Sequence, residues 1–420
     1  MCEKCLDKGS IIMDVSGELC VRCRGGKNLC GLPYCPVVIR ASVKELTTYS
    51  TDIYGSSPPS VFVGRHGYPH VRVGPATPPE VGDTSIYDLP EMWFNLSLNE
   101  ILRFRYSLIR GTYITAINEL NSKYVVSLQE LALTLRPVDT ELVFEKKPKP
   151  KVYFDEYLPP QGPSAPLKDF KIVSNPLSDK RLEKVYYDTD LKAFEGVIEL
   201  YRNNVPISAI QKLFSVGGLG MARSRKLVPT RWSITAVDSV ISHYLISQVK
   251  KLPIINSYML YIRKFANNTF IGILAPRTWS FEWMEAWFPG STWNKFGMTA
   301  EIEGDYEGFK GRSEYPEIGG CYYASRLASA EALLNMKRQA TVILWREIYE
   351  GFDIPIGVWF VRENVRAMFK EKPKVFNTLK ELLNHLSESN YTRIPITSWV
   401  KKSYLMETIL KQESIDKYLS

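Results

Sequence analysis

The sequence predicts a mixed α/β (α+β) globular core, with a short cysteine-rich segment before it and a short terminal peptide after it. Hydrophobic residues make up 45% of the 420 residues, and the 24 Tyr, 18 Phe and 9 Trp are too many for a disordered chain, so that one large or two moderate cores can be buried. Apolar residues recur at helical spacing in some segments and in short strand-like runs in others. Six of the seven cysteines lie within the first 35 residues.

Those cysteines include two Cys-x2-Cys pairs separated by fourteen residues, which is close to the spacing of a zinc ribbon. The four candidate ligands are Cys2, Cys5, Cys20 and Cys23. Four thiolates complete a tetrahedral site without an open position, so we expect a structural Zn²⁺ that folds residues 1–35. The alternative is a set of reduced thiols without a metal. Cys30 and Cys35 have a different spacing, and we leave them outside the ligand set.

The first half of the core is expected to alternate strands, helices and loops. A Pro/Gly-rich stretch over 56–75 predicts a short buried strand between irregular loops. Residues 91–121 have helical spacing with three arginines close together, which makes a basic face possible, and 124–135 also has helical character. Several prolines in 146–167 predict an exposed connection with few backbone donors.

Further along, helices and a hairpin are expected. Apolar spacing over 191–201 predicts one helix, and a capping box that begins at Ser208 predicts the start of the next, which ends at Gly217. Thr235, followed by Asp238, predicts the start of a third helix. Two apolar runs on either side of 267–268 predict a β-hairpin.

Residues 215–235 combine glycines, cationic side chains, hydroxyls and a predicted helix start, which are the parts of a phosphate site. The candidate ligands are Gly217, Gly218, Gly220, Arg223, Arg225, Lys226, Thr230, Arg231 and Thr235. The spacing matches neither a P-loop nor a dinucleotide-binding fingerprint. The alternative is a glycine turn that ends a helix and a solvated basic loop after it.

Two other segments contain residue types that could serve a catalytic or metal site. Residues 304–315 gather carboxylates and basic groups among glycines, as an active-site loop or an ordinary surface loop would. His66 and His70 lie four residues apart, but the glycine and proline between them argue against a helix that offers both to one metal.

The last residues follow the pattern Gln-x-x-Ile-x-x-Tyr-Leu, which resembles the PIP box, the peptide that binds the sliding clamp PCNA. The residues that carry this resemblance are Gln412, Ile415, Tyr418 and Leu419. In a single 3₁₀ turn, positions three apart eclipse, so Ile415 and Tyr418 would project together beside Leu419. An amphipathic chain end that matches by chance is the alternative, since Leu419 stands where many such motifs have a second aromatic residue.

Charge and hydropathy add weaker indications. Lysine and arginine exceed aspartate and glutamate by 53 − 45 = 8, which favours a polyanionic partner such as nucleic acid but also suits many other proteins. No apolar run is long enough for a membrane span, and the first residues do not have the pattern of a secretory signal. We therefore expect a cytoplasmic protein without a membrane partner.

Together these features resemble the archaeal Nre family of DNA repair proteins. The resemblance is carried by the cysteine pairs, the terminal peptide and the motifs over 57–64, 225–238 and 319–328. It implies a four-cysteine zinc finger, association with PCNA and a part in the response to DNA damage. The regions it implies are a zinc finger over 1–35, an N-terminal family region over 36–300, a C-terminal family region over 301–408 and a PIP-box tail over 409–420.

Three hypotheses remain open at this point. In the first, a PCNA-bound repair factor binds DNA or a nucleotide through the segment at 215–235. In the second, the same site is catalytic, with Asp238, or Asp305 and Glu307, as acid, base or metal ligand. In the third, the zinc protein acts on RNA. No nucleophile or reaction is indicated by the sequence.

Overall fold

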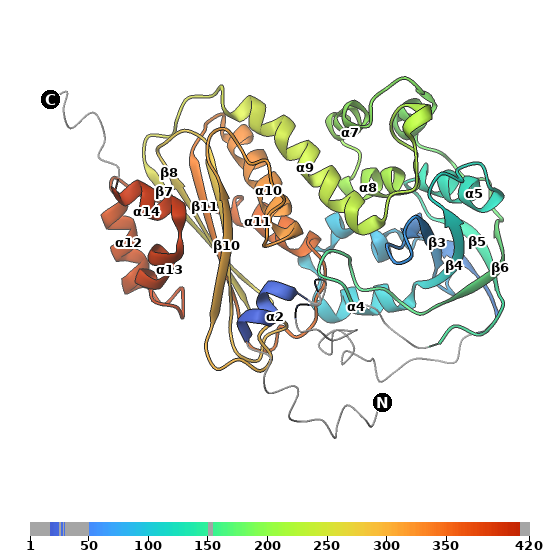
Figure 1. Cartoon of the computed structure of the whole chain (residues 1–420), viewed down its shortest axis with the longest axis horizontal. Coiled ribbons are helices and arrows are strands. Elements are labelled where there is room, and N and C mark those ends of the chain that lie inside the picture. Colours follow the sequence, from blue (N-terminus) through green and yellow to red (C-terminus); the bar gives the residue numbers. More distant parts are fainter. Residues whose placement is uncertain (1–16, 25–26, 28, 30–49, 150–153, 412–420) are drawn as a thin grey trace. The chain divides into compact units, whose positions relative to one another are not determined.

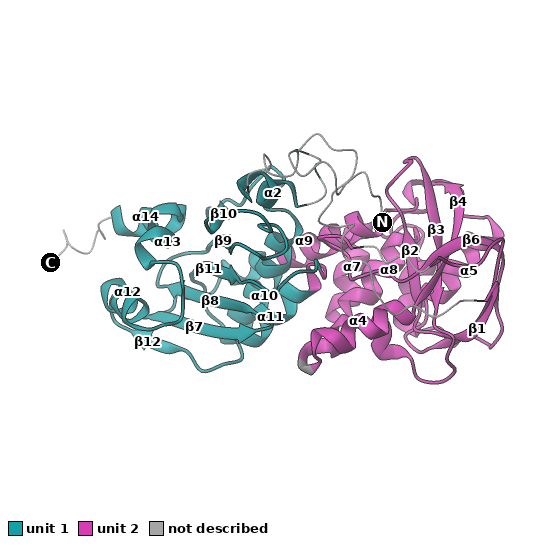
Figure 2. Cartoon of the chain, turned by 90° about the horizontal axis from the view of Figure 1, so that it is seen from below, with its two compact units in different colours: residues 1–38, 245–355, 360–420 teal, residues 39–244, 356–359 magenta. Residues whose placement is uncertain are grey.

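The computed structural model describes residues 17–24, 27, 29, 50–149 and 154–411 (Figure 1). The chain divides into two units, shown in Figure 2. Unit 1 consists of residues 1–38, 245–355 and 360–420, and unit 2 consists of residues 39–244 and 356–359. Each unit contains a six-stranded sheet and helices, which confirms the predicted mixed α/β class. Among the described residues, no helix is long and apolar enough to cross a membrane.

The sheet of unit 2 has the strand order β1-β5-β6-β4-β3-β2. Its strands are β1 (Asp52–Ser57), β2 (Ser60–Val63), β3 (His70–Thr77), β4 (Ile109–Ala116), β5 (Val138–Phe144) and β6 (Ser164–Ile172). Neighbouring strands are antiparallel except for β4 and β6, which are parallel. Buried and less buried residues alternate along β5, as expected for a strand with one face on a core.

Helices connect and follow the strands of unit 2. They are η2 (Ser85–Asp88), η3 (Pro90–Asn95), α4 (Leu98–Ser107), α5 (Lys123–Ala132), α6 (Lys180–Tyr187), α7 (Ala193–Arg202), α8 (Ile207–Ser215), η4 (Ala222–Ser224) and α9 (Thr230–Val249), whose last residues belong to unit 1. A capping box at Ser97 and Glu100 begins α4, and Ser122 caps α5, so local sequence sets both starts.

The sheet of unit 1 has the order β10-β9-β11-β8-β7-β12. Its elements are α2 (Gly17–Cys23), β7 (Tyr258–Phe265), β8 (Asn268–Ala275), β9 (Ser280–Trp287), β10 (Glu301–Glu307), α10 (Gly320–Met336), β11 (Thr341–Ile348), α11 (Trp359–Met368), β12 (Lys374–Phe376), α12 (Leu379–Glu388), α13 (Ile396–Lys402) and α14 (Tyr404–Lys411). Every residue of β8 and β11 is buried, because α12–α14 pack on one face of the sheet while α10 and α11 contact the other.

Helix α14 is held to the sheet by a buried carboxylate. Glu282 of β9 accepts hydrogen bonds from the backbone N–H groups of Tyr404 (2.7 Å) and Leu405 (3.4 Å) and from the hydroxyl of Ser403. Burial raises the pKa of Glu282 to about 7, although these donors oppose the increase. The carboxylate therefore satisfies the first N–H groups of the helix that directly precedes the terminal peptide.

Several expected elements are confirmed. The short strand within 56–75 is β2, although the flanking residues 56–57 and 70–75, expected as loops, belong to β1 and β3. The helices expected over 124–135 and 191–201 are α5 and α7. The hairpin is formed by β7 and β8, with Ala266 and Asn267 in its turn at positive φ values of 48° and 55°. Positive φ at both turn residues is typical of a two-residue hairpin turn.

Other expectations are wrong. Residues 109–116 form strand β4 and not a helix, because they pair with β3 and β6. Helix α8 begins at Ile207, and Ser208 donates its N–H and hydroxyl to Glu91 instead of capping the helix. Helix α9 begins at Thr230, five residues before the predicted start.

The connection expected to be exposed over 146–167 is also packed in its described second half. Phe154, Tyr157 and Leu158 are buried. Gly162 lies so close to the Leu108 carbonyl oxygen that an added Cβ would come within 2.2 Å of it. The described second half of this segment is therefore packed within unit 2 and is not a solvent-exposed connection.

Candidate functional site

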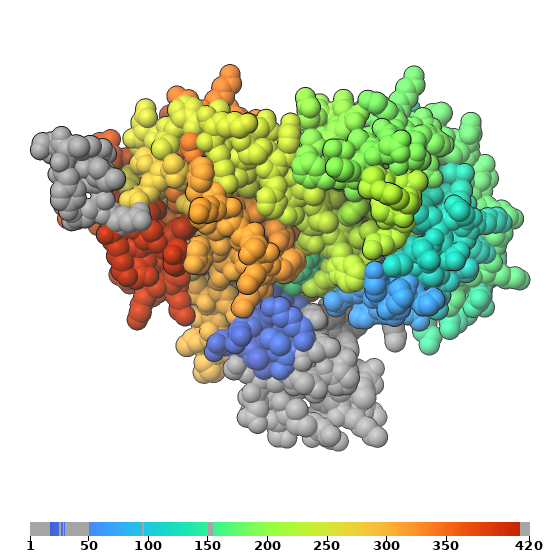
Figure 3. Space-filling model, turned by 45° about the horizontal axis from the view of Figure 1, so that its top comes forward, coloured from blue at the N-terminus to red at the C-terminus, as the bar shows by residue number. Residues whose placement is uncertain are grey.

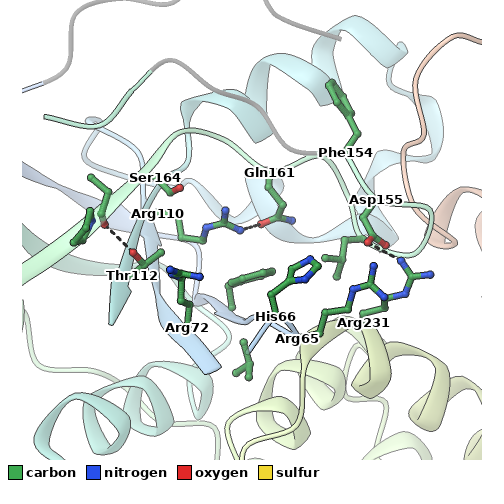
Figure 4. A pocket seen from close by; sticks show the side chains of 16 residues that line it. Arg65, His66, Arg72, Arg110, Thr112, Phe154, Asp155, Gln161, Ser164 and Arg231 are labelled. Carbon is green, nitrogen blue, oxygen red and sulfur yellow. Dashed lines mark hydrogen bonds and ion pairs between the residues drawn. The ribbon is translucent and has the colours of Figure 1, made fainter. Parts of the chain in front are cut away.

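Unit 2 contains a cavity of about 540 Å³, which Figure 4 shows from close by. The β2–β3 hairpin, β4, the segment 154–166 and the first turn of α9 form its walls. The lining residues are Phe62, Val63, Gly64, Arg65, His66, Arg72, Arg110, Thr112, Phe154, Asp155, Leu158, Gln161, Ser164, Ala165, Pro166 and Arg231. Its volume is in the range of sites that bind small organic ligands.

Positive charge dominates this cavity. Arginines at 65, 72, 110 and 231 line it, whereas Asp155 is the one acidic residue among the described residues of its lining. Figure 4 shows these arginines entering from the hairpin, β4 and α9. Because arginine remains protonated at any physiological pH, the cavity suits a ligand with negative charge. We name this set of arginines, together with the lining around them, the arginine pocket.

Two of the arginines are fixed by aromatic rings and polar partners. Arg110 is 7% exposed, lies 4.1 Å from the centroid of the Phe62 ring and donates to Oε1 of Gln161 at 3.1 Å. Arg231 lies 3.7 Å from the centroid of the Tyr157 ring and pairs with Asp155 at 2.7 Å. A ring against one face of a guanidinium leaves its in-plane N–H donors directed outward, as phosphate oxygens require.

Arg65 and Arg72 supply the remaining charge. No ion pair joins either of them to a carboxylate within the part of the chain that the structure describes. Burial and the nearby charge of Arg231 lower the pKa of Arg65, although Asp155 partly compensates. Burial also opposes the charge of Arg231, but Asp155 and Glu156 outweigh it and raise the pKa of Arg231. An anion between Arg65 and Arg231 would relieve their mutual repulsion.

The first turn of α9 is positioned by a contact to the sheet. The hydroxyl oxygen of Thr230 accepts a hydrogen bond from the Val63 N–H of β2 at 2.9 Å, and it lies 3.1 Å from the Ser215 hydroxyl. This contact places Arg231 in the same cavity as Arg65 of the hairpin. Two residues of the predicted phosphate segment, Thr230 and Arg231, therefore belong to the pocket or support it.

The glycines of that segment are used to end α8. Gly217 and Gly218 donate their N–H groups to the carbonyl oxygens of Phe214 (3.2 Å) and Leu213 (2.9 Å). Gly217 has a φ of 75°, which is typical of the glycine after a helix. Gly217, Gly218 and Gly220 are all buried, so their amides do not face a ligand in this structure.

The other residues of the segment have separate positions. Arg225 donates to the carbonyl oxygens of Gly220 at 2.6 Å and Asp188 at 3.1 Å, which fixes the turn around η4. The Thr235 hydroxyl donates to the Trp232 carbonyl oxygen at 3.1 Å within α9. Arg223 and Lys226 are exposed, and neither lines the arginine pocket.

The carboxylates considered for catalysis have structural partners. Asp238 is 0% exposed and accepts a hydrogen bond from Gln211 at 3.0 Å. Asp305 pairs with Arg312 at 3.0 Å, and the buried Glu307 pairs with Arg326 at 2.7 Å. Asp305 and Glu307 belong to strand β10 of unit 1, whereas Asp238 belongs to unit 2. None of the three lines the arginine pocket.

Half of the predicted zinc site falls within the described residues. Cys20 and Cys23 lie three residues apart in α2, so their side chains share one face of a helix. Cys2, Cys5, Cys30 and Cys35 lie outside the described residues. Within the described part of the chain, no group of three or more potential ligands is close enough to hold a metal.

Helix α2 is firmly attached to unit 1. Arg24, directly after Cys23, pairs with Glu285 at 2.8 Å, and Arg346 pairs with the same carboxylate at 2.9 Å. Burial opposes the charge of Glu285, but the two arginines lower its pKa. In Figure 3, α2 (blue) lies against the orange residues of unit 1, consistent with its packing on β10.

The sequence does not predict three of the four pocket arginines, at 65, 72 and 110, as site residues. Arg110 lies in the segment 91–121, for which the sequence predicts helical spacing. One signal was available, because Arg72 between Val71 and Val73 has the alternation of a strand with one exposed face. The PIP-box residues 412–420 lie outside the described residues, directly after α14.

Comparisons with known proteins give the following matches. The family model described as "Archaeal Nre, N-terminal" matches residues 29–294, and that described as "Archaeal Nre, C-terminal" matches residues 307–418. The DNA repair protein NreB of Archaeoglobus fulgidus is 47% identical over 92% of this chain and 97% of its own length. The DNA repair proteins NreA of Archaeoglobus fulgidus and of Haloferax volcanii are 35% and 33% identical, over 88% and 86% of this chain and 93% and 87% of their own. No solved structure matches the chain.

Proposed function

Because this chain belongs to the archaeal Nre family and its relatives are DNA repair proteins, we propose that it is a DNA repair factor that binds a phosphate group of DNA in the arginine pocket. The observation that supports this most directly is the excess of arginines over carboxylates in the pocket lining. Phosphates dominate the affinity of proteins for nucleic acids, and arginine binds them through paired donors. Of the phosphate ligands predicted from the sequence, Arg231 lies in this pocket. The other ligands proposed here are Arg65, Arg72 and Arg110 and not the glycine amides.

The salt dependence of DNA binding tests this proposal. Each phosphate contact to a single strand releases counterions, so that three or four contacts should give a slope of about −2 to −3 for log K against log salt. We expect fluorescence anisotropy with labelled DNA to show this slope, with little dependence on base sequence. An affinity that stays constant from about 50 to about 200 mM salt would rule out phosphate binding as the main contribution.

The second part of the proposal is recruitment to PCNA through the terminal peptide. Gln412, Ile415, Tyr418 and Leu419 provide the polar and apolar positions of a PIP box. The peptide follows directly after α14, which ends at Lys411 and is anchored to β9 by Glu282. A recognition peptide that follows an anchored helix can bind a partner while the helix keeps its place on the sheet.

The third part is a structural Zn²⁺ on Cys2, Cys5, Cys20 and Cys23. Cys20 and Cys23 support it, because two thiolates on one face of α2 can share a metal ion. Bound zinc would stabilise the N-terminal segment and, through the Arg24–Glu285 ion pair, its attachment to unit 1.

Removal of zinc should therefore destabilise the protein. We expect a strong chelator to lower the melting temperature of the full chain by several degrees or more, because metal binding contributes to the folding free energy. Elemental analysis should find zinc in the wild type and in Cys30→Ser, and no zinc in Cys20→Ser. A wild-type protein purified without zinc, and insensitive to the chelator, would refute this part of the proposal.

A further inference from the structure

Two exposed aromatic rings lie next to each other on unit 2. Tyr68 and Trp232 have ring centroids 5.2 Å apart and an interplanar angle of 57°, and each residue is 43% exposed. Tyr68 lies in the β2–β3 turn two residues after His66, and Trp232 directly follows Arg231. His66 and Arg231 both line the arginine pocket, so each ring lies within two residues of a lining residue, although neither ring is part of the lining itself.

The backbone on both sides of this pair is fixed. In the hairpin, Gly64 donates its N–H to the Arg72 carbonyl oxygen at 2.7 Å, and His70 donates to the Gly67 carbonyl oxygen at 2.9 Å. On α9, the Thr230 hydroxyl accepts the Val63 N–H, as described above. Tyr68 is therefore presented by a turn that is bonded to β3, and Trp232 by the start of α9, which is bonded to β2.

The position of the cations limits which phosphates can reach them. Arg110 is 7% exposed, and the side chain of Arg231 is 13% exposed, so both guanidinium groups lie inside the cavity and not on a flat surface. In a regular duplex each phosphate lies on the outer surface of a stiff double helix, so it enters a cavity only where the helix as a whole fits around the opening. A phosphate of an unpaired nucleotide can enter.

From this arrangement we infer that the arginine pocket selects unpaired nucleotides in DNA, with a phosphate among the arginines and an adjacent base stacked on Trp232 and Tyr68. This inference rests on the proposed function and names its substrate class, which is single-stranded DNA or an unpaired strand end. Exposed aromatic side chains beside a cationic groove are the general means by which proteins bind single strands without sequence preference.

The test is a set of affinities measured by fluorescence anisotropy with the full chain. The probes are a short 5′-phosphorylated oligothymidylate, the same strand without its 5′ phosphate, and a blunt duplex of matched length. We expect the single strand to bind at least tenfold tighter than the duplex. Trp232→Ala should weaken single-strand binding about tenfold, as expected for loss of one base-stacking contact, whereas Trp232→Phe should retain most of the affinity.

A matched control is available on the same sheet. Tyr54 is 50% exposed on β1, the edge strand opposite β2, and Tyr54→Ala should leave the affinity unchanged. Loss of affinity on removal of the 5′ phosphate would assign the pocket to a strand end, and unchanged affinity to an internal phosphate; either agrees with the inference.

The inference would be overturned if Trp232→Ala bound the single strand like the wild type, or if the wild type bound the duplex as tightly as the single strand. If DNA binding still depended steeply on salt in either case, the proposed function would stand. If the wild type binds none of the probes, the proposed function fails together with the inference.

Discussion

A chain that ends at Lys411 should show no saturable binding to PCNA in a calorimetric titration, whereas the full chain should bind. The truncation removes Gln412, Ile415, Tyr418 and Leu419, which together carry the match to the PIP box. In a 3₁₀ turn, Ile415 and Tyr418 would project on the same side and form one apolar contact surface. Removal of both side chains would therefore remove that surface.

The same truncation should leave the melting temperature nearly unchanged, because α14 and its anchor at Glu282 lie before the removed residues. In the full chain, the double variant Ile415→Ala with Tyr418→Ala should abolish PCNA binding, while Glu413→Ala serves as its control. Equal PCNA affinity of the truncated and full chains would show that the terminal peptide is not the binding element.

Replacement of Arg65 and Arg72 by glutamine should weaken DNA binding about a hundredfold. Hydrogen bonds to charged groups contribute about 1.5–3 kcal/mol each, so the loss of two such contacts corresponds to roughly a hundredfold or more. These two arginines are the suitable pair, because no carboxylate pairs with either among the described residues and their removal leaves no buried acid uncompensated. The melting temperature should change little.

The control for this variant is the exposed pair in the segment that the sequence suggested. Arg223→Gln with Lys226→Gln removes the same charge from the same unit, outside the pocket. It should weaken binding far less than the pocket variant. If the two double variants lose the same affinity, DNA binding depends only on the overall positive charge of the protein, and the pocket is not a specific phosphate site.

Local elements of the fold could be predicted because neighbouring residues determine them. The hairpin of β7 and β8, whose turn lies one residue before the predicted 267–268, and the apolar face of α7 are of this kind. Strand β4 could not be predicted, since its partners β3 and β6 lie far away in the sequence and the residues of 109–116 have no strong alternation of their own. Helix α9 begins before the predicted start because the Pro229 carbonyl oxygen already accepts the N–H groups of Trp232 and Ser233.

The candidate site was predictable only in part. The sequence pointed to Arg231 because it stands among glycines and other cations near a helix start. Arg65, Arg72 and Arg110 are brought together by the pairing of β2, β3 and β4, which no local pattern encodes. The glycines were misleading for a physical reason: a cluster of glycines serves equally well to end a helix, which is what Gly217 and Gly218 do after α8.

If the arginine pocket holds a phosphate of DNA, a crystal structure of the protein with a 5′-phosphorylated single strand should show it directly. We expect phosphate oxygens within hydrogen-bonding distance, about 3 Å, of at least two of the guanidinium groups of Arg65, Arg72, Arg110 and Arg231. A strand whose phosphates contact Arg223 and Lys226, or unit 1 alone, with the pocket excluded from the interface, would contradict it.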